Sequence, residues 1–296
     1  MTVLDTPDSR NSAPTRTNAV PVVLPERPAG RHAGWAVLTT MLGRDAWVLR
    51  GQLGPLALRA VLQPLAFTFG FAYVLPSIGW GAAGHGTGGS YSTVLVPGLV
   101  AITIAVQGIS AVLSPLLMEM TYTQQIEDRA LVPAPLWVLG VQKILSGAVQ
   151  ALVCGLVVFP VVLLVHAPGN RPHVHVADWP LLVVVLVLAS LVAGCLGLLL
   201  GTVFEAVKVQ YLFAAVVTPL TMLGCVYFPW SSLSVVPWLQ WLTLLNPVVY
   251  MGEGLRAALT PQVPHLPVPV VLAVQVGLVA VLGFAACRSF VRRISR

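Results

Sequence analysis

The stretch of sequence that decides the fold has two halves: Val94–Leu117 reads VLVPGLVAITIAVQGISAVLSPLL, and Met118–Trp137 reads MEMTYTQQIEDRALVPAPLW. The first half carries no Asp, Glu, Lys or Arg and exceeds the roughly 20 apolar residues that a helix needs to cross a bilayer. The second half is the densest cluster of charge between the first and last hydrophobic segments, and its charged residues are Glu119, Glu127, Asp128 and Arg129. This boundary predicts a membrane-spanning helix that ends in a water-exposed loop.

The composition of the whole chain indicates that lipid is its main solvent. Of its 296 residues, 57% are hydrophobic and only 9% are charged, and the mean hydropathy is +0.86. A soluble domain carries about 25% charged residues. The apolar runs are continuous rather than alternating, which favours helices over the strands of a membrane barrel. We therefore expect an all-α membrane protein with six transmembrane helices: Pro55–Ile78, Val94–Leu117, Gly140–Val165, Leu181–Phe204, Val209–Phe228 and Val268–Phe290.

The basic residues predict how these spans are oriented. Six spans place both termini on one side, and all but Arg171 and Arg256 of the 16 lysines and arginines then fall on that side. The positive-inside rule makes that side cytoplasmic. The net charge of +6 is explained by topology and by contact with anionic lipid. Nucleic-acid binding is the competing interpretation, but no folded basic domain is present in the sequence to carry it.

The chain before the first span divides into two parts. Residues 1–33 contain five prolines, scattered charge and no apolar run, which excludes a signal peptide and predicts a disordered cytoplasmic tail. Residues 34–296 are expected to form one six-span domain. Within it, Gly34–Gln52 mixes tryptophan and leucine with Arg44, Asp45 and Arg50, as in an amphipathic helix that lies in the headgroup plane. A simple extension of the first span is the alternative near Arg50.

The segment Pro229–Pro267 departs from the pattern of plain spans. It is too polar and too rich in proline to cross the bilayer, and its three tryptophans favour the membrane interface. We expect a re-entrant hairpin of two short helices, broken where Asn246 is the N-cap and Pro247 the first helical residue. On the second helix, Glu253 and Arg256 are three residues apart and are expected to pair. The pair either holds the hairpin together or contacts the substrate.

Motifs for chemistry within this chain are weak or missing. The glycine-rich loop Gly79–Ser90 lacks the lysine of a phosphate-binding loop, so the chain is not expected to hydrolyse nucleotide by itself. His173 and His175 have no further placed ligands, and we expect no metal site. An intramembrane enzyme needs paired catalytic groups at one depth, and an ion-driven transporter usually carries a buried acid in mid-span. Neither pattern occurs in the six predicted spans.

The charged loop Met118–Trp137 has two interpretations. It is either an ordinary solvated loop or a docking surface for a soluble partner. Three observations favour docking. The loop joins two long spans, and the next span begins at Pro135 and Trp137 with Lys143 close to its start. The other inner loop, Glu205–Lys208, is too short to form a docking surface. A short helix is expected over Gln124–Leu131, ending before Pro133.

The order of these parts resembles a type-2 ABC transporter permease, the membrane subunit of a bacterial ATP-driven exporter. Two segments carry the resemblance, from about Gly34 to the C-terminus: EDRALVPAP at Glu127–Pro135, and LNPVVY at Leu245–Tyr250 followed by Glu253 and Arg256. One departure is that many members of the family have a Gly-Thr-Leu-Glu-like stretch where this chain has Ile126–Leu131.

The resemblance implies several properties of this chain. Gln124, Glu127, Asp128 and Arg129 would contact an ATP-binding subunit through the coupling helix Gln124–Leu131. Asn246, Pro247, Tyr250, Glu253 and Arg256 would belong to the re-entrant hairpin or gate. Two permease copies and two ATPase subunits would be required, as a homodimer or a heterodimer of permeases. ATP and Mg²⁺ would be held by the ATPase subunits, and this chain would need no cofactor of its own.

The cargo and the membrane are expectations of the same resemblance. Spans without ionic groups suit an amphiphilic drug, an antibiotic or a lipid-like molecule. A lipid-linked polysaccharide is the alternative cargo, and an ion-coupled secondary transporter is the remaining alternative function. The expected location is the bacterial inner or plasma membrane.

Overall fold

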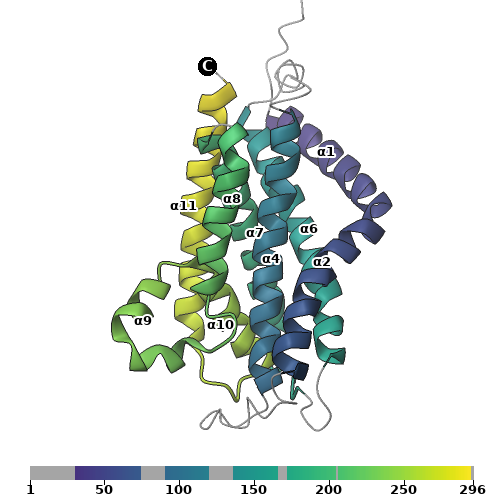
Figure 1. Ribbon diagram of the computed structural model, residues 1–296. Coiled ribbons are helices and arrows are strands. Elements are labelled where there is room, and N and C mark those ends of the chain that lie inside the picture. The colour runs from purple at the N-terminus through teal and green to yellow at the C-terminus, as the bar shows by residue number, and fades with distance from the viewer. Residues whose placement is uncertain (1–30, 75–90, 120–135, 166–171, 205, 295–296) are drawn as a thin grey trace, which may run out of the picture.

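The computed structural model describes residues 31–74, 91–119, 136–165, 172–204 and 206–294, and within these residues the regular structure is entirely helical (Figure 1). The long elements are α1 (Arg31–Gly51), α2 (Leu53–Thr68), α4 (Tyr91–Met118), α6 (Leu136–Leu164), α7 (Trp179–Val203), α8 (Ala206–Met222) and α11 (Val268–Ile294). The shorter elements are the π-helix η1 (Phe69–Val74), the 3-10 helix η3 (Trp230–Val235), α9 (Pro237–Thr243) and α10 (Pro247–Leu259).

The long helices form a bundle around α4. Figure 1 shows α2, α4, α6, α7, α8 and α11 running along a common direction, with α1 diverging from them at one end. We call that end, where α1 lies and α11 finishes, the tail end, and we call the opposite end, where η3, α9 and α10 lie, the hairpin end. In the most apolar stretch of α4, 89% of the residues are buried, whereas in that of α11 only 17% are buried. The helix α4 is therefore the core helix, and α11 lies at the periphery.

Small residues let the central helices pack closely. A Cβ added at Gly108 of α4 would lie 2.6 Å from the Cβ of Ala193 on α7. A Cβ added at Gly194 of α7 would lie 2.6 Å from the carbonyl oxygen of Ile144 on α6. In lipid there is no hydrophobic force between helices, so close van der Waals packing at such positions is a main source of association. The contacts α4–α6, α4–α7 and α6–α7 therefore hold the centre of the molecule together.

Four of the predicted spans are helices long and apolar enough to cross a membrane: Ser92–Met118, Leu136–Leu164, Trp179–Val203 and Val268–Ile294. The first predicted span corresponds to α2 and η1, which together cover Leu53–Val74, and its last four residues lie outside the described residues. Within the described part of the chain, the fifth corresponds to α8, whose apolar stretch Phe213–Met222 is shorter. The helices α2 and α8 are therefore not among the four that are long and apolar enough to cross a membrane.

The fifth span ends earlier than its hydropathy predicts. Apolar residues continue to Phe228, but α8 ends at Met222, and the chain then turns at Gly224 and Cys225. Cys225 has a φ of 50°, in the left-handed region that is uncommon for a residue with a side chain. The physical reason is a long-range contact, because the carbonyl groups of this turn bind Arg256 of α10, as described below.

The helix α1 is separate from α2. The two helices are divided at Gln52, which precedes α2 with a φ of −105° and a ψ of 6°. Trp35 and Trp47 of α1 are 68% and 77% exposed, whereas Leu38 is buried. The structure therefore divides this region into two helices at Gln52, and the placement of α1 in the headgroup plane stays a prediction.

Candidate functional site

The helix α10 is the buried element on which the site is built. Every residue from Val248 to Leu259 is buried, although α10 contains both a glutamate and an arginine. It contacts α4, α7 and α11, so it is enclosed by the bundle rather than laid on its surface. Because water is excluded, each polar group of α10 needs a partner within the protein.

The first turn of α10 is fixed by Asn246 and Pro247, as the sequence predicts. The Asn246 side chain accepts a hydrogen bond from the backbone N–H of Val248 at 2.9 Å, and Pro247 occupies the first turn, where a missing N–H has no consequence. The Nδ2 group of Asn246 donates to the carbonyl oxygen of Leu220 at 2.9 Å. That carbonyl belongs to the last turn of α8, so one side chain caps the start of α10 and the end of α8.

Glu253 and Arg256 form the predicted ion pair, and both side chains are fully buried. Arg256 Nη1 donates to Glu253 Oε1 at 2.8 Å. The same oxygen accepts from the backbone N–H of Trp230 at 3.0 Å, and Glu253 Oε2 accepts from the backbone N–H of Leu266 at 2.9 Å. Arg256 Nη2 donates to the carbonyl oxygens of Cys225 at 2.6 Å and Val226 at 3.3 Å.

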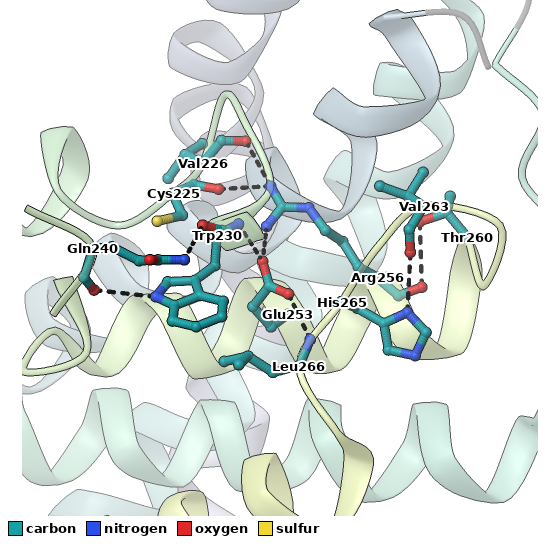
Figure 2. Close-up of polar contacts among 10 residues, drawn as sticks. All are labelled: Cys225, Val226, Trp230, Gln240, Glu253, Arg256, Thr260, Val263, His265 and Leu266. Carbon is teal, nitrogen blue, oxygen red and sulfur yellow. Dashed lines mark hydrogen bonds and ion pairs between the residues drawn. The ribbon is translucent and has the colours of Figure 1, made fainter. Parts of the chain in front are cut away.

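These contacts join four segments of the chain around the ion pair (Figure 2). We call the set the Glu253–Arg256 clamp, and it consists of Cys225, Val226, Trp230, Glu253, Arg256 and Leu266. The clamp holds the turn after α8, the start of η3, the middle of α10 and the segment before α11. Of its side-chain polar atoms, Arg256 Nε is buried without a hydrogen-bond partner among the described residues. A charge pair with this many hydrogen bonds is stable while intact, and losing one member exposes the other to the full penalty of burial.

The turn of the clamp packs directly against the backbone of α4 at Gly98. A Cβ added at Gly98 would lie 1.9 Å from the carbonyl oxygen of Val226, a separation that no side chain tolerates. The turn is therefore enclosed between α4 on one side and Arg256 on the other. Glycine is required at residue 98 because backbone, rather than a movable side chain, fills the space.

Tyr250 and Gln275 connect α10 to its neighbours. The Tyr250 hydroxyl donates to the carbonyl oxygen of Leu244 at 2.9 Å, which ties α10 to the end of α9. Gln275 of α11 is fully buried and donates from Nε2 to the carbonyl oxygen of Tyr250 at 3.1 Å. Tyr250 therefore contacts the end of α9 through its hydroxyl and contacts α11 through its backbone carbonyl group.

The end of α10 is satisfied by an extended segment before α7. The backbone N–H groups of His175 and Ala177 donate to the carbonyl oxygens of Leu259 and Ala258, each at 3.1 Å. These carbonyls lie in the last turn of α10 and would otherwise be unpaired. The histidines are thus placed by their backbone, and among the described residues no three His, Cys, Asp or Glu side chains gather as a metal site would require.

The tail end holds a different set of polar contacts. Lys143 Nζ of α6 lies 2.7 Å from Glu119 Oε2, and the two side chains are 11% and 14% exposed. Gln142 of α6 donates from Nε2 to Asp45 Oδ2 of α1. Arg293 of α11 donates from Nη1 to the carbonyl oxygens of Gly201 and Thr202, each at 3.0 Å, at the end of α7. These contacts join α1, α4, α6, α7 and α11 at the end where the charged loop Met118–Trp137 begins.

The four residues predicted to contact an ATPase subunit, Gln124, Glu127, Asp128 and Arg129, lie outside the described residues, as does the predicted coupling helix Gln124–Leu131. The structure does place the two ends of that loop: Glu119 after α4, and Leu136 at the start of α6. Since α4 and α6 pack along their length, the two ends are attached to the core of the bundle.

Several members of the site were not predicted from the sequence. The partners of the ion pair are backbone groups of Cys225, Val226, Trp230 and Leu266, and backbone groups carry no sequence signal. Gln275 has a weak signal, because a glutamine in the middle of an apolar span must find a partner. The predicted residues Asn246, Pro247, Tyr250, Glu253 and Arg256 do come together on or beside α10.

Comparison with known proteins gives the family. Residues 40–260 match the family described as ABC-2 type transporter. The chain is also 30% identical over 172 residues to the inner membrane transport permease YadH of Escherichia coli strain K12, and equally to the YadH proteins of Escherichia coli O157:H7 and Shigella flexneri. The matched region covers 57% of this chain and 63% of each relative. With a family match over residues 40–260, the chain belongs to the ABC-2 type transporter family, and four of its described helices are long and apolar enough to cross a membrane.

Proposed function

We propose that this chain is the membrane-spanning subunit of an ATP-driven exporter that moves an amphiphilic drug, antibiotic or lipid-like molecule outward. The observation that carries the proposal is the match of residues 40–260 to the ABC-2 family, whose membrane subunits work with ATP-binding subunits. The charged loop after α4 supports the proposal, because it offers a soluble partner a surface attached directly to α4 and α6, which pack against each other.

In this proposal the chain crosses the membrane six times. The helix α2 continues into η1 over Leu53–Val74, and α8 together with the turn after it completes the fifth crossing. The tail end then faces the cytoplasm with both termini, and α1 lies along the cytoplasmic headgroups. The hairpin of α9 and α10 lies in the outer leaflet, where its exposed Trp238 and Trp241 suit the interface.

This orientation assigns a separate role to the charged loop and to the hairpin end. Gln124, Glu127, Asp128 and Arg129 contact the ATP-binding subunit, which holds ATP and Mg²⁺ and carries out hydrolysis. Movement of the loop is passed to α4 and α6, and α4 contacts α10 at the hairpin end. Two permease copies and two ATP-binding subunits make the complete transporter, and a homodimer is the simpler arrangement.

The gate proposed at the hairpin end rests on the Glu253–Arg256 clamp. Because the clamp joins the turn after α8, η3, α10 and the segment before α11, these elements move as a unit. Because the pair is buried and bound to backbone groups, its proposed role is to position the hairpin rather than to contact the substrate. This arrangement also disfavours an ion-coupled transporter, because Glu253 is already paired and is not available to carry an ion.

The test is reconstitution of the chain in proteoliposomes with and without its proposed ATP-binding subunit. Uptake of a fluorescent amphiphile into inside-out vesicles is the readout. Transport is expected only with the ATP-binding subunit and hydrolysable ATP. Transport by this chain alone, or driven by an ion gradient without ATP, would contradict the proposal.

A lipid-linked polysaccharide is the alternative cargo, and it is tested in the same vesicles. The two cargoes differ in which substrate stimulates ATP hydrolysis by the reconstituted complex. Stimulation by small amphiphiles supports the proposed cargo, and stimulation by the lipid-linked glycan alone supports the alternative.

A further inference from the structure

A groove of about 650 Å³ lies at the tail end between the start of α6 and the last part of α11. Two of its lining residues, Trp137 and Val141, belong to α6, and the other six belong to α11. Its polar groups are the guanidinium groups of Arg288 and Arg292, the Cys287 thiol and the indole N–H of Trp137, and the other lining residues are apolar. We call it the Arg288 groove.

The basic residues of α11 divide between two faces of the helix. Arg293 turns toward the bundle and donates to the carbonyl oxygens of Gly201 and Thr202. Arg288 and Arg292 are exposed, and their spacing of four residues places them on the same face. Arg288 has no carboxylate partner within the described part of the chain. Its charge is therefore available to a ligand from outside the chain.

The lining of the Arg288 groove is positively charged, and its described residues include no aspartate or glutamate. A zwitterionic headgroup would bring its cation next to two guanidinium groups without a carboxylate to receive it. A headgroup with a net negative charge brings a phosphate without such a cation, and guanidinium binds phosphate through charge-assisted hydrogen bonds. Charge complementarity therefore favours an anionic ligand.

The apolar part of the groove continues along α11, away from its charged end. Phe284 lies one turn before Arg288 and is 71% exposed, and Val281 is 67% exposed. A Cβ added at Gly277 would meet nothing within 4 Å, so the same stripe of the helix stays open one turn further on. Because α11 is long and apolar enough to cross a membrane, this stripe offers a surface to an acyl chain.

Trp137 indicates the depth at which the groove lies. It is 57% exposed at the start of α6, and exposed tryptophan prefers the level of the lipid headgroups. Arg288 and Arg292 line the same groove, so their guanidinium groups lie at the level of phospholipid phosphates. A basic pocket between transmembrane helices at this level suits the headgroup of an anionic lipid.

We propose that the Arg288 groove binds a phospholipid with a net negative charge, such as phosphatidylglycerol. The phosphate accepts hydrogen bonds from Arg288 and Arg292, and an acyl chain lies along Phe284 and Val281. The lipid also contacts Trp137, so it bridges α6 and α11 at the end where the charged loop enters α6. The proposal requires that α11 crosses the membrane, and it requires neither an ATP-binding subunit nor a cargo.

The experiment compares an anionic with a zwitterionic lipid on the full-length chain. Protein purified in dodecyl maltoside and freed of lipid is mixed with equal amounts of phosphatidylglycerol and phosphatidylethanolamine with identical acyl chains. Native mass spectrometry then measures the ratio retained. Two arginines near the membrane surface predict a preference of at least about tenfold for phosphatidylglycerol. A ratio near one for the wild-type protein would overturn the proposal.

A pair of charge variants separates the groove from the general positive charge of the protein. Arg288→Gln should lower the preference about fivefold, the effect of one arginine. Arg50→Gln is the matched control, because Arg50 is also exposed but lies at the end of α1, outside the groove, and it should leave the preference unchanged. Equal losses in the two variants, or no loss in Arg288→Gln, would overturn the site.

A steric variant distinguishes a lipid from a second copy of the chain. Val141→Trp fills the space between α6 and α11 and should reduce the amount of phosphatidylglycerol retained. Leu156→Trp is its control, because Leu156 is 56% exposed on the same helix but outside the groove. Equal retention by the two variants would contradict the site. Conversion of dimers into monomers by Val141→Trp, with the lipid ratio unchanged, would assign the groove to a second copy and overturn the lipid assignment.

A soluble competitor distinguishes a lipid from a free phosphate ester. Glycerophosphoglycerol carries the same headgroup without acyl chains and is added in large excess. The lipid is expected to stay bound, and its displacement would overturn the lipid assignment. Since no ATP-binding subunit is present, failure of this proposal is distinguishable from failure of the proposed export function.

Discussion

The two ends of the bundle use charge in opposite ways. At the hairpin end, Glu253 and Arg256 are fully buried and bound to four backbone groups. At the tail end, Lys143 and Glu119 are partly exposed and lie beside a cavity. Breaking a fully buried, hydrogen-bonded pair is costly, whereas breaking a pair that keeps some contact with solvent is expected to cost less. The hairpin end is therefore held together by its charged pair, whereas the tail end carries its charged pair beside a cavity.

The largest expected effect comes from breaking the clamp. Glu253→Ala should lower the free energy of unfolding by about 3–5 kcal/mol, because it leaves the Arg256 guanidinium buried without its partner. The folded fraction after heating in detergent, followed by size-exclusion chromatography, measures the loss. The double variant Glu253→Leu with Arg256→Met is the control, and it should recover much of the stability since no charge is left unpaired. Equal loss in both variants would show that packing, not charge, holds the hairpin end.

A smaller but clear effect is expected at Gly98. Gly98→Ala forces a methyl group onto the Val226 carbonyl and should destabilise the protein by about 1–3 kcal/mol through overpacking. Gly277→Ala in α11 is the matched control, because a Cβ there meets nothing within 4 Å. That control should be neutral or gain up to about 1 kcal/mol from helix propensity. Thermal unfolding of both variants measures the difference, and equal stabilities would refute the close contact of α4 with the turn.

Asn246 gives the next effect. Asn246→Ala should cost about 1 kcal/mol of stability through the lost cap of α10 and the lost bond to Leu220. Asn246→Ser keeps a side-chain acceptor for Val248 and introduces no charge, so its effect should be smaller. Chemical denaturation in mixed micelles ranks the two variants. A larger loss for Ser than for Ala would contradict the capping role.

The smallest effect is expected at the tail end. Lys143→Ala should cost about 1 kcal/mol or less, because the pair with Glu119 is partly exposed and is screened by solvent. Its thermal unfolding is compared with that of Glu253→Ala under identical conditions. A loss of stability several times larger for Glu253→Ala would support the contrast between the two ends, and equal losses would contradict it.

Local signals account for what the sequence predicts correctly. Continuous apolar runs locate four helices long enough to span the membrane. The cap at Asn246 with Pro247 depends on adjacent residues, and the Glu253–Arg256 pair depends on a spacing of three along one helix. Each of these features depends only on residues that are close together in the sequence, so it can be predicted without knowledge of the tertiary fold.

Tertiary contacts account for what the sequence does not reveal. Hydropathy places the end of the fifth span at Phe228, but α8 stops at Met222 because Arg256 binds carbonyl groups of the turn that follows. The role of Gly98 depends on the approach of Val226, a residue more than a hundred positions away. The cavity at the tail end depends on how α1 diverges from α2 at Gln52, and no run of residues predicts that angle.

The charged loop after α4 is proposed to transmit the work of an ATP-binding subunit, and charge reversal at Glu127 and Asp128 is the test of that role. Transport and ATP hydrolysis are measured together in proteoliposomes that contain the wild-type complex or the variant Glu127→Lys with Asp128→Lys. We predict that transport per ATP falls at least about tenfold, which corresponds to about 1.4 kcal/mol of lost coupling, while thermal stability is unchanged. Normal transport by a folded variant would contradict the account.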